Sequence, residues 1–270
     1  MRYGICMDLA DGYKHHLLAE KLGAIHNAGY DYIETSVSGL SHLSEVETLQ
    51  IRGVLERNGL TCLRANGFFP PQIRLTGPGA SAEEIEEYLK TVLPRAAGLG
   101  VKTIVLGSGA SRQIPDDMPY QHAFEQFCEY GKMICKQAEA YGIRIAIEHL
   151  NPRETNFITT IEEAGAVIDS IGMENCGLLF DYYHIDADTN DLRNVAVLKE
   201  KLFHVHAAVP ETRKYPRMAD EPVMRPFFET VAKAAYDGTV SVEASMNEGM
   251  TYEENLNQSL QLFRQHRPVR

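Results

Sequence analysis

The stretch YGIRIAIEHL, residues 141–150, contains the pattern that decides the fold of this chain. Gly142 follows a helical pattern, a short apolar run comes next, and Glu148 then opens a polar loop. A glycine at this place can end a helix in the left-handed conformation and return the chain to a strand. The same transition from helix through glycine to strand recurs in NGL at 58–60 and in LGV at 99–101. We therefore expect helices and strands to alternate along the chain.

Eight short apolar runs occur at this rhythm, each followed by a polar loop and a longer helical pattern. They cover residues 3–7, 32–35, 61–65, 103–106, 144–147, 177–180, 202–205 and 239–242. Strands that alternate with helices pair in parallel through right-handed crossovers. Eight such units in 270 residues predict the α/β class and a single (β/α)8 TIM barrel over residues 1–270. An open doubly wound sheet is the alternative.

Two helix starts and three long loops can be located. Ser81 with Glu84, and Thr159 with Glu162, have the spacing of a capping box and predict helices over 82–98 and 164–171. The longest irregular segments cover 68–80, 107–118 and 207–222, and all three follow predicted strands. In a parallel barrel this carboxyl end of the strands is the face where active sites are assembled.

Composition narrows the class of protein. A formal net charge of −11 argues against a nucleic-acid partner, which requires a clustered basic face. The N-terminus has no apolar run long enough for a signal peptide or a membrane span, so we expect a soluble cytoplasmic enzyme. An odd number of cysteines without a C-x-x-C pair predicts free thiols in a reducing compartment: Cys6, Cys62, Cys128, Cys135 and Cys176.

The last four predicted strands each end in a residue that can bind a metal. These residues are Glu148, Asp181, His206 and Glu243. One acidic residue after a strand is usually a helix cap or a salt-bridge partner, but in a closed barrel these four successive ends converge on one rim. Three carboxylates and one imidazole suit a divalent cation such as Mn²⁺, Co²⁺, Mg²⁺ or Zn²⁺. Without a cation, three converging carboxylates repel and at least one is protonated.

At these positions the sequence resembles the xylose-isomerase-like barrel superfamily, especially its ketose 3-epimerase and hydroxypyruvate isomerase branches. The resemblance runs from Tyr3 to about Ser245 and is carried by EHLNPRET (148–155), DYYH (181–184), HVH (204–206) and VE (242–243). It implies that the four strand-end residues bind one divalent metal, with Mn²⁺ the most expected. It further implies that Glu148 and Glu243 exchange the substrate proton.

The resemblance also implies roles for residues around these four. His184 and Glu154 match substrate-contacting residues, and Arg213 approximately matches an arginine that binds substrate oxygens. Glu34 matches an acidic position with a supporting role. The chain departs from the epimerase pattern after His206, where it reads AAVPETRK instead of a Gly-Glu stretch with paired arginines. His204 is expected to be an interior layer residue of the barrel rather than a partner of His206.

The function that follows is a metal-dependent isomerase or epimerase of a ketose or related polyol ketone, working through an enediolate. A lyase on the same scaffold, such as an inosose dehydratase or a 3-keto-glycoside deglycosidase, is the alternative, because it begins with the same proton abstraction. The abasic-site endonuclease branch is disfavoured, because its extra histidines are replaced by Asn66-Gly67 and Gly107-Ser108-Gly109. A catalytically silent barrel is a fourth reading. The segment 244–247 lacks a glycine-rich phosphate loop, which favours an unphosphorylated substrate. The resemblance implies a homo-oligomer, either dimer or tetramer.

Overall fold

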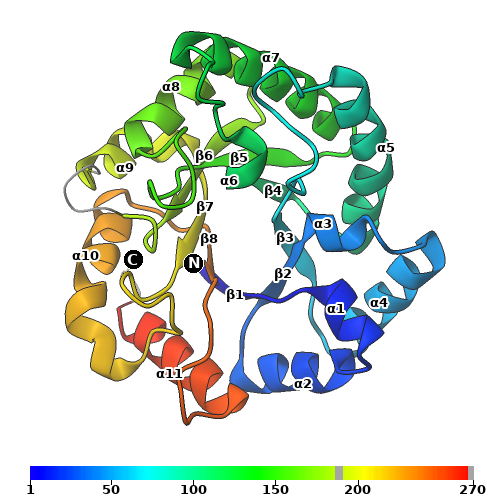
Figure 1. Cartoon of the computed structure of the whole chain (residues 1–270). Coiled ribbons are helices and arrows are strands. Elements are labelled where there is room, and N and C mark those ends of the chain that lie inside the picture. Colours follow the sequence, from blue (N-terminus) through cyan, green and yellow to red (C-terminus); the bar gives the residue numbers. More distant parts are fainter. Residues whose placement is uncertain (186–190, 267–270) are drawn as a thin grey trace.

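The strands form a closed parallel barrel in sequence order, which confirms the predicted fold and excludes the open sheet. The structure, a computed structural model, describes residues 1–185 and 191–266. Figure 1 shows the ring of strands with the helices outside it. The strands are β1 (Arg2–Cys6), β2 (Tyr32–Ser36), β3 (Cys62–Asn66), β4 (Thr103–Leu106), β5 (Arg144–Glu148), β6 (Cys176–Asp181), β7 (Leu202–Ala207) and β8 (Thr239–Val242).

Each strand is followed by helical segments that return the chain to the start of the next strand. The longer helices are α2 (Leu18–Ala28), α4 (Glu45–Arg57), α5 (Ala82–Leu99), α7 (Tyr120–Glu139), α8 (Ile161–Ile171), α10 (Glu221–Lys233) and α11 (Tyr252–Gln265). Short segments lie in the connections: α1 (Leu9–Lys14), α3 (Val37–Leu40), α6 (Gly109–Arg112), α9 (Arg193–Val197), η1 (Lys199–Lys201) and η2 (Met218–Asp220).

The helix-ending glycines behave as the sequence predicts, whereas one helix start is shifted. Gly100 and Gly142 have positive φ angles of 100° and 65°. Ser81 caps α5 by accepting a hydrogen bond from the backbone of Glu84. The predicted box of Thr159 and Glu162 is wrong by one residue: the box is formed by Thr160 and Glu163. Ile161, which is fully buried, therefore becomes the first helical residue.

The two faces of the strands have different surroundings. Large apolar side chains of one face pack against the helices and form the main core. The other face points into the barrel, because side chains alternate along a strand. Under β4, β5 and β6 the interior is apolar, with Val105, Ala146 and Leu179 in one small cluster. Elsewhere the buried interior is polar, and its residues include Glu34, Arg64, His204, Thr239 and Ser241.

The five cysteines are free thiols, as predicted, and four of them are buried.

Candidate metal centre

The carboxyl ends of β5 to β8 bring the four predicted metal-binding side chains together. Glu148 and Asp181 are the last residues of β5 and β6, His206 lies on β7, and Glu243 directly follows β8. Asp181 and His206 are paired in register on neighbouring strands. One ligand atom from each of the four side chains lies within 4.8 Å of the others. We call Glu148, Asp181, His206 and Glu243 the rim cluster.

The geometry of the rim cluster fits a single cation. Nδ1 of His206 lies 3.7 Å from Glu148 Oε1, 3.6 Å from Glu243 Oε2 and 4.0 Å from Asp181 Oδ2. These separations are too long for hydrogen bonds but suit atoms that share a central ion. Nδ1 of His206 and Oδ2 of Asp181 are buried without a hydrogen-bond partner within the described part of the chain. Because buried polar atoms normally have partners, the two atoms indicate a ligand position.

Electrostatics in the metal-free protein support the same interpretation. Burial, with added repulsion from Glu148 and Glu243, raises the pKa of Asp181 to about 8. Burial also raises the pKa of Glu148. Burial disfavours the charged form of His206, but Glu34 and the rim carboxylates outweigh it and raise the pKa of His206 well above its usual value. The cluster therefore holds protons that a divalent cation would replace.

Glu243 differs from the other rim carboxylates because cationic and amide donors hold it. Arg213 donates to its Oε2 at 2.7 Å, and Asn66, at the end of β3, donates to its Oε1 at 2.6 Å. Burial opposes ionisation of Glu243, but His206 and Arg213 outweigh it and lower the pKa of Glu243 to about 2. At neutral pH Glu243 is therefore ionised, whereas Asp181 is mostly protonated.

The three predicted substrate-contacting residues lie beside the rim cluster. Nε2 of His184 is 3.5 Å from Asp181 Oδ2, and Nδ1 of His184 is 3.8 Å from Glu154 Oε1. Arg213 is 3.6 Å from Glu154 and stacks over the ring of Tyr183, with a positive φ angle of 51°. The structure therefore brings His184, Glu154 and Arg213 together.

His184 has a defined tautomer. The side-chain amide of Asn151 can donate to its Nδ1 at 2.9 Å, which leaves the hydrogen on Nε2. Burial, with His149 and Arg213, lowers the pKa of His184 to about 2, so the ring is neutral. Its Nε2–H points towards the rim carboxylates, 3.5 Å from Asp181 Oδ2 and 3.9 Å from Glu148 Oε1.

Several supporting residues were missed in the sequence. Gly107 lies against Glu148, because a Cβ at this position would be 2.0 Å from Glu148 Oε2. Arg112 is fully buried and donates to the backbone carbonyl of Glu148 at 2.8 Å and to that of Ile158 at 3.1 Å. The place of Gly107 directly after a strand was a usable signal, whereas nothing in the sequence marked Arg112.

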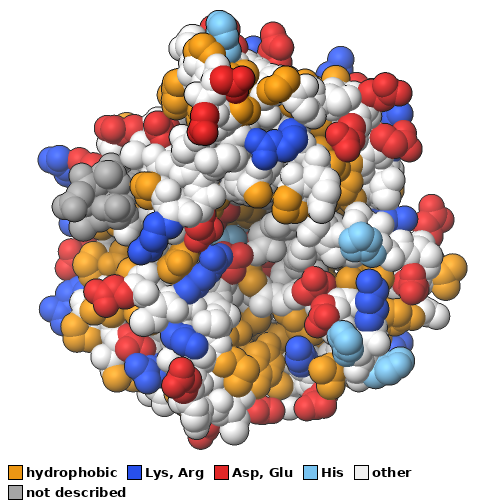
Figure 2. Space-filling model, viewed as in Figure 1, with side chains coloured by type: hydrophobic (Ala, Val, Ile, Leu, Met, Phe, Trp, Pro, Cys, Tyr) orange, Lys and Arg blue, Asp and Glu red, His pale blue; other side chains and the backbone are white. Residues whose placement is uncertain are grey.

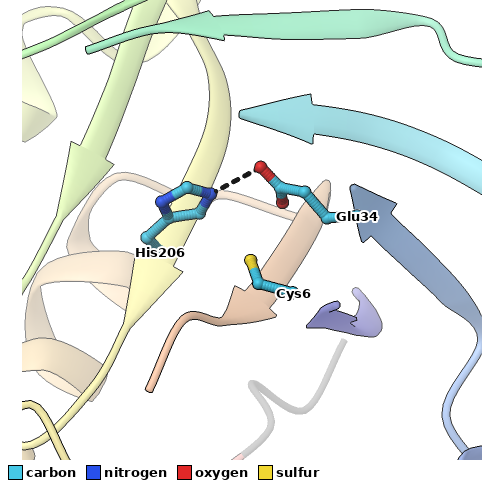
Figure 3. Close-up of side chains that lie close together, drawn as sticks. All are labelled: Cys6, Glu34 and His206. Carbon is cyan, nitrogen blue, oxygen red and sulfur yellow. Dashed lines mark hydrogen bonds and ion pairs between the residues drawn. The ribbon is translucent and has the colours of Figure 1, made fainter. Parts of the chain in front are cut away.

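One layer deeper, Glu34 of β2 hydrogen-bonds both His204 and His206, so it has the supporting position that the sequence predicted (Figure 3). His204 fills the barrel interior, as expected, and its Nε2 also lies 2.7 Å from Glu34 Oε2.

Comparison with known proteins places this geometry in a family. The sequence profile described as xylose isomerase-like TIM barrel matches residues 22–266. The chain belongs to this family. Its closed barrel of eight parallel strands agrees with that description.

Relatives of this chain include a D-psicose 3-epimerase and an inosose isomerase. The chain is 23% identical over 250 residues to a D-psicose 3-epimerase of Ruminiclostridium cellulolyticum, covering 90% of this chain and 82% of the relative. It is 23% identical over 218 residues to an inosose isomerase of Bacillus velezensis, covering 78% and 74%. The solved structure of a D-allulose 3-epimerase from Methylomonas with D-allulose has a TM-score of 0.83 at 18% identity, covering 98% and 97%. No helix in the described residues is long and apolar enough to cross a membrane.

Proposed function

We propose that this protein is a divalent-metal-dependent epimerase or isomerase that moves a proton next to the carbonyl of a ketose or related polyol ketone. The observation that carries the proposal is the rim cluster. It places two glutamates around one buried histidine nitrogen and one buried carboxylate oxygen that have no partner within the described residues. The relatives named above, which are sugar epimerases and inosose isomerases, support the same reaction class.

The cation would be held by Glu148, Asp181, His206 and Glu243, and Mn²⁺ is the proposed ion because the donor set is mostly oxygen. When bound, it would supply Lewis-acid stabilisation of the negative charge that develops on the substrate oxygens.

The two glutamates would exchange the proton. Glu148 and Glu243 come from strands separated by β6 and β7, so they approach the centre from different sides. One carboxylate would remove the proton to give an enediolate, and the other would return a proton to the opposite face in an epimerisation. In an aldose–ketose isomerisation, a single base on one face would be sufficient.

Neighbouring side chains would orient the substrate. The neutral His184 would donate its Nε2–H to a substrate oxygen, and Glu154 would accept from a hydroxyl. Arg213 bridges Glu243 and Glu154 in the structure, so a substrate would have to share or replace these contacts. Such an exchange favours a ligand rich in hydroxyl groups.

The segment after β8 supports an unphosphorylated substrate. Residues 244–247 lack the glycine-rich loop that binds phosphate in many barrels of this kind. Figure 2 shows that this face of the molecule is hollowed at its centre.

The test is deuterium incorporation from solvent. The protein, first stripped of metal and then loaded with Mn²⁺ or Co²⁺, is incubated in D₂O with ketoses, aldoses, inososes and 3-keto glycosides, and products are identified by mass spectrometry and chromatography. We expect deuterium at one carbon of an isomeric product, with no incorporation by the stripped protein. Loss of water or of an aglycone would replace the proposal with a lyase. Metal-independent exchange, or no exchange by loaded protein, would overturn it. Light scattering would test the proposed dimer or tetramer.

A further inference from the structure

A second cluster of ionisable side chains lies beneath the rim cluster and is not used by the proposed reaction. Glu34 of β2 sits between His204 and His206 of β7, and all three side chains are fully buried. Its Oε2 lies 2.7 Å from His204 Nε2, and its Oε1 lies 2.8 Å from His206 Nε2. Figure 3 shows the Glu34 carboxylate pointing at one ring nitrogen of His206, which is Nε2. The other ring nitrogen, Nδ1, lies 3.7 Å from Glu148 Oε1 of the rim cluster. We call Glu34, His204 and His206 the Glu34 unit.

The direction of these hydrogen bonds can be assigned. An ionised carboxylate only accepts, so both histidines carry a hydrogen on Nε2 and donate it to Glu34. Each Glu34 oxygen lies within hydrogen-bond distance of one ring nitrogen, which is the geometry of a carboxylate that accepts from both rings. With the hydrogen on Nε2, the lone pair of His206 Nδ1 is directed into the rim cluster. This is the form of the ring that can bind a metal there.

His204 is itself held in place from deeper in the barrel. Its Nδ1 lies 2.8 Å from the hydroxyl of Thr239, and Arg64 Nε donates to the same hydroxyl at 3.1 Å. Arg64, Thr239 and His204 are all buried. A continuous chain of hydrogen bonds therefore runs from β3 through β8 and β7 to Glu34, and ends at His206.

Two other interpretations fit the Glu34 unit less well. Cys6, Glu34 and His206 are close enough to hold a second cation, but both Glu34 oxygens already accept from ring N–H groups at hydrogen-bond distance. A role in stability alone is a poor reason to bury a carboxylate, because apolar replacements of buried ion pairs are often neutral or stabilising.

We propose that Glu34 is a positioning residue that fixes the orientation and tautomer of His206 so that Nδ1 is available to the metal. This inference rests on the proposed function, because it takes His206 to be a metal ligand. Outer partners of metal-binding histidines typically contribute about 10–100-fold to metal affinity. His204 contributes indirectly, because it occupies the second oxygen of Glu34 and prevents the carboxylate from rotating away.

The test compares Mn²⁺ and Zn²⁺ affinity in wild-type protein and in Glu34→Gln, measured by competition with a chelating dye. Glutamine keeps the shape but presents an NH₂ group to one of the two ring N–H donors. We expect the Kd for metal to rise about 10–100-fold. The metal-free variant should still unfold cooperatively but at a lower temperature than wild type, because glutamine leaves one buried ring N–H without an acceptor. Thr35→Val is the matched control, since Thr35 is buried on the same strand but its hydroxyl accepts from the backbone of Leu9, and the Kd should not change.

A second variant and a second measurement distinguish the role of Glu34 from that of the metal site itself. Glu34→Asp retains the charge on a shorter side chain and should lose less affinity than Glu34→Gln. In zinc-loaded protein labelled with ¹⁵N-histidine, the Nε2 proton of His206 should be deshielded and exchange slowly in wild type but not in Glu34→Gln. Wild type that binds no metal would overturn the proposed function. Wild type that binds one equivalent while Glu34→Gln binds equally well would overturn only the role of Glu34. Two equivalents, one lost in Glu34→Gln, would make the unit a second metal site.

Discussion

The two halves of the barrel contribute different chemistry to the same rim. Strands β5 to β8 end in the three carboxylates and the histidine of the rim cluster. Strands β1 to β4 end in Cys6, Ser36, Asn66 and Leu106, none of which is charged. Because three carboxylates already repel one another, a fourth at the level of the rim would raise their pKa values further. The neutral half therefore provides space and hydrogen bonds, while the charged half provides the ligands.

The acidic residue of the first half is placed one layer deeper. Glu34 of β2 faces two histidines instead of the rim carboxylates, and it approaches His206 from the side opposite the proposed metal. The barrel interior is divided in a similar way, because its apolar cluster consists of side chains of β4, β5 and β6. The interior below His206 of β7 is therefore polar, whereas the interior below Gly107, which follows β4, is apolar.

The largest effect should come from removing a ligand in the charged half. We expect His206→Ala to abolish metal binding and to lower kcat/KM by about a thousandfold or more, because several kcal/mol of charge stabilisation are lost. Metal analysis and steady-state assays measure the two effects together. His122→Ala changes an exposed histidine of α7 and should alter neither. Stoichiometric metal in His206→Ala would remove His206 from the ligand set.

A smaller effect is expected when a proposed catalytic carboxylate is neutralised without changing its shape. Glu243→Gln keeps an acceptor for only one of Arg213 and Asn66 and cannot take a proton, so kcat should fall about 10²–10⁴-fold. The melting temperature should change little. Rate measurements at saturating substrate and Mn²⁺ separate lost chemistry from weaker metal binding. Normal turnover would show that Glu243 is not one of the two proton-transfer groups.

The neutral half can be tested at Gly107, where close packing replaces charge. In Gly107→Ala the new Cβ would lie 2.0 Å from Glu148 Oε2, so the carboxylate must move. A displacement of this size can cost about a hundredfold in rate. Gly98→Ala is the control, since a Cβ at this position in α5 meets nothing within 4 Å. Wild-type activity in Gly107→Ala would mean that the position of Glu148 is not critical.

The sequence predicted the charged half much better than the neutral half. Glu148, Asp181, His206 and Glu243 stand directly at strand ends, so counting strands was enough to bring them together. Asn66 is also a strand-end residue, but its bond to Glu243 depends on the closure of the barrel between β3 and β8. The contact of Arg112 with the Glu148 carbonyl depends on the path of the connection after β4. The sequence of that connection has no periodic pattern from which its path could be predicted. The bond between His204 and Glu34 was not predicted, because strand alternation gives the face of a side chain but not its partner.

The smallest expected effect is on stability, and it depends on the charges of the metal-free rim. The pKa of Asp181 is raised to about 8 from an ordinary value of 3.8, so the folded state binds its proton more tightly than the unfolded state. This stabilisation is complete below about pH 4 and is lost as the pH rises through about 8. The raised pKa values of Glu148 and His206 act in the same direction.

The melting temperature of the metal-free protein should therefore fall by several degrees between pH 5 and pH 8, since about 1 kcal/mol corresponds to roughly 2–4 °C in a chain of this size. Mn²⁺ should raise it more at pH 8 than at pH 5, because the cation compensates carboxylates that have lost their protons. Asp181→Asn removes one of the charges and should flatten the metal-free profile, while losing the response to Mn²⁺. A metal-free melting temperature that rises from pH 5 to pH 8 would contradict the charge repulsion on which the contrast between the two halves depends.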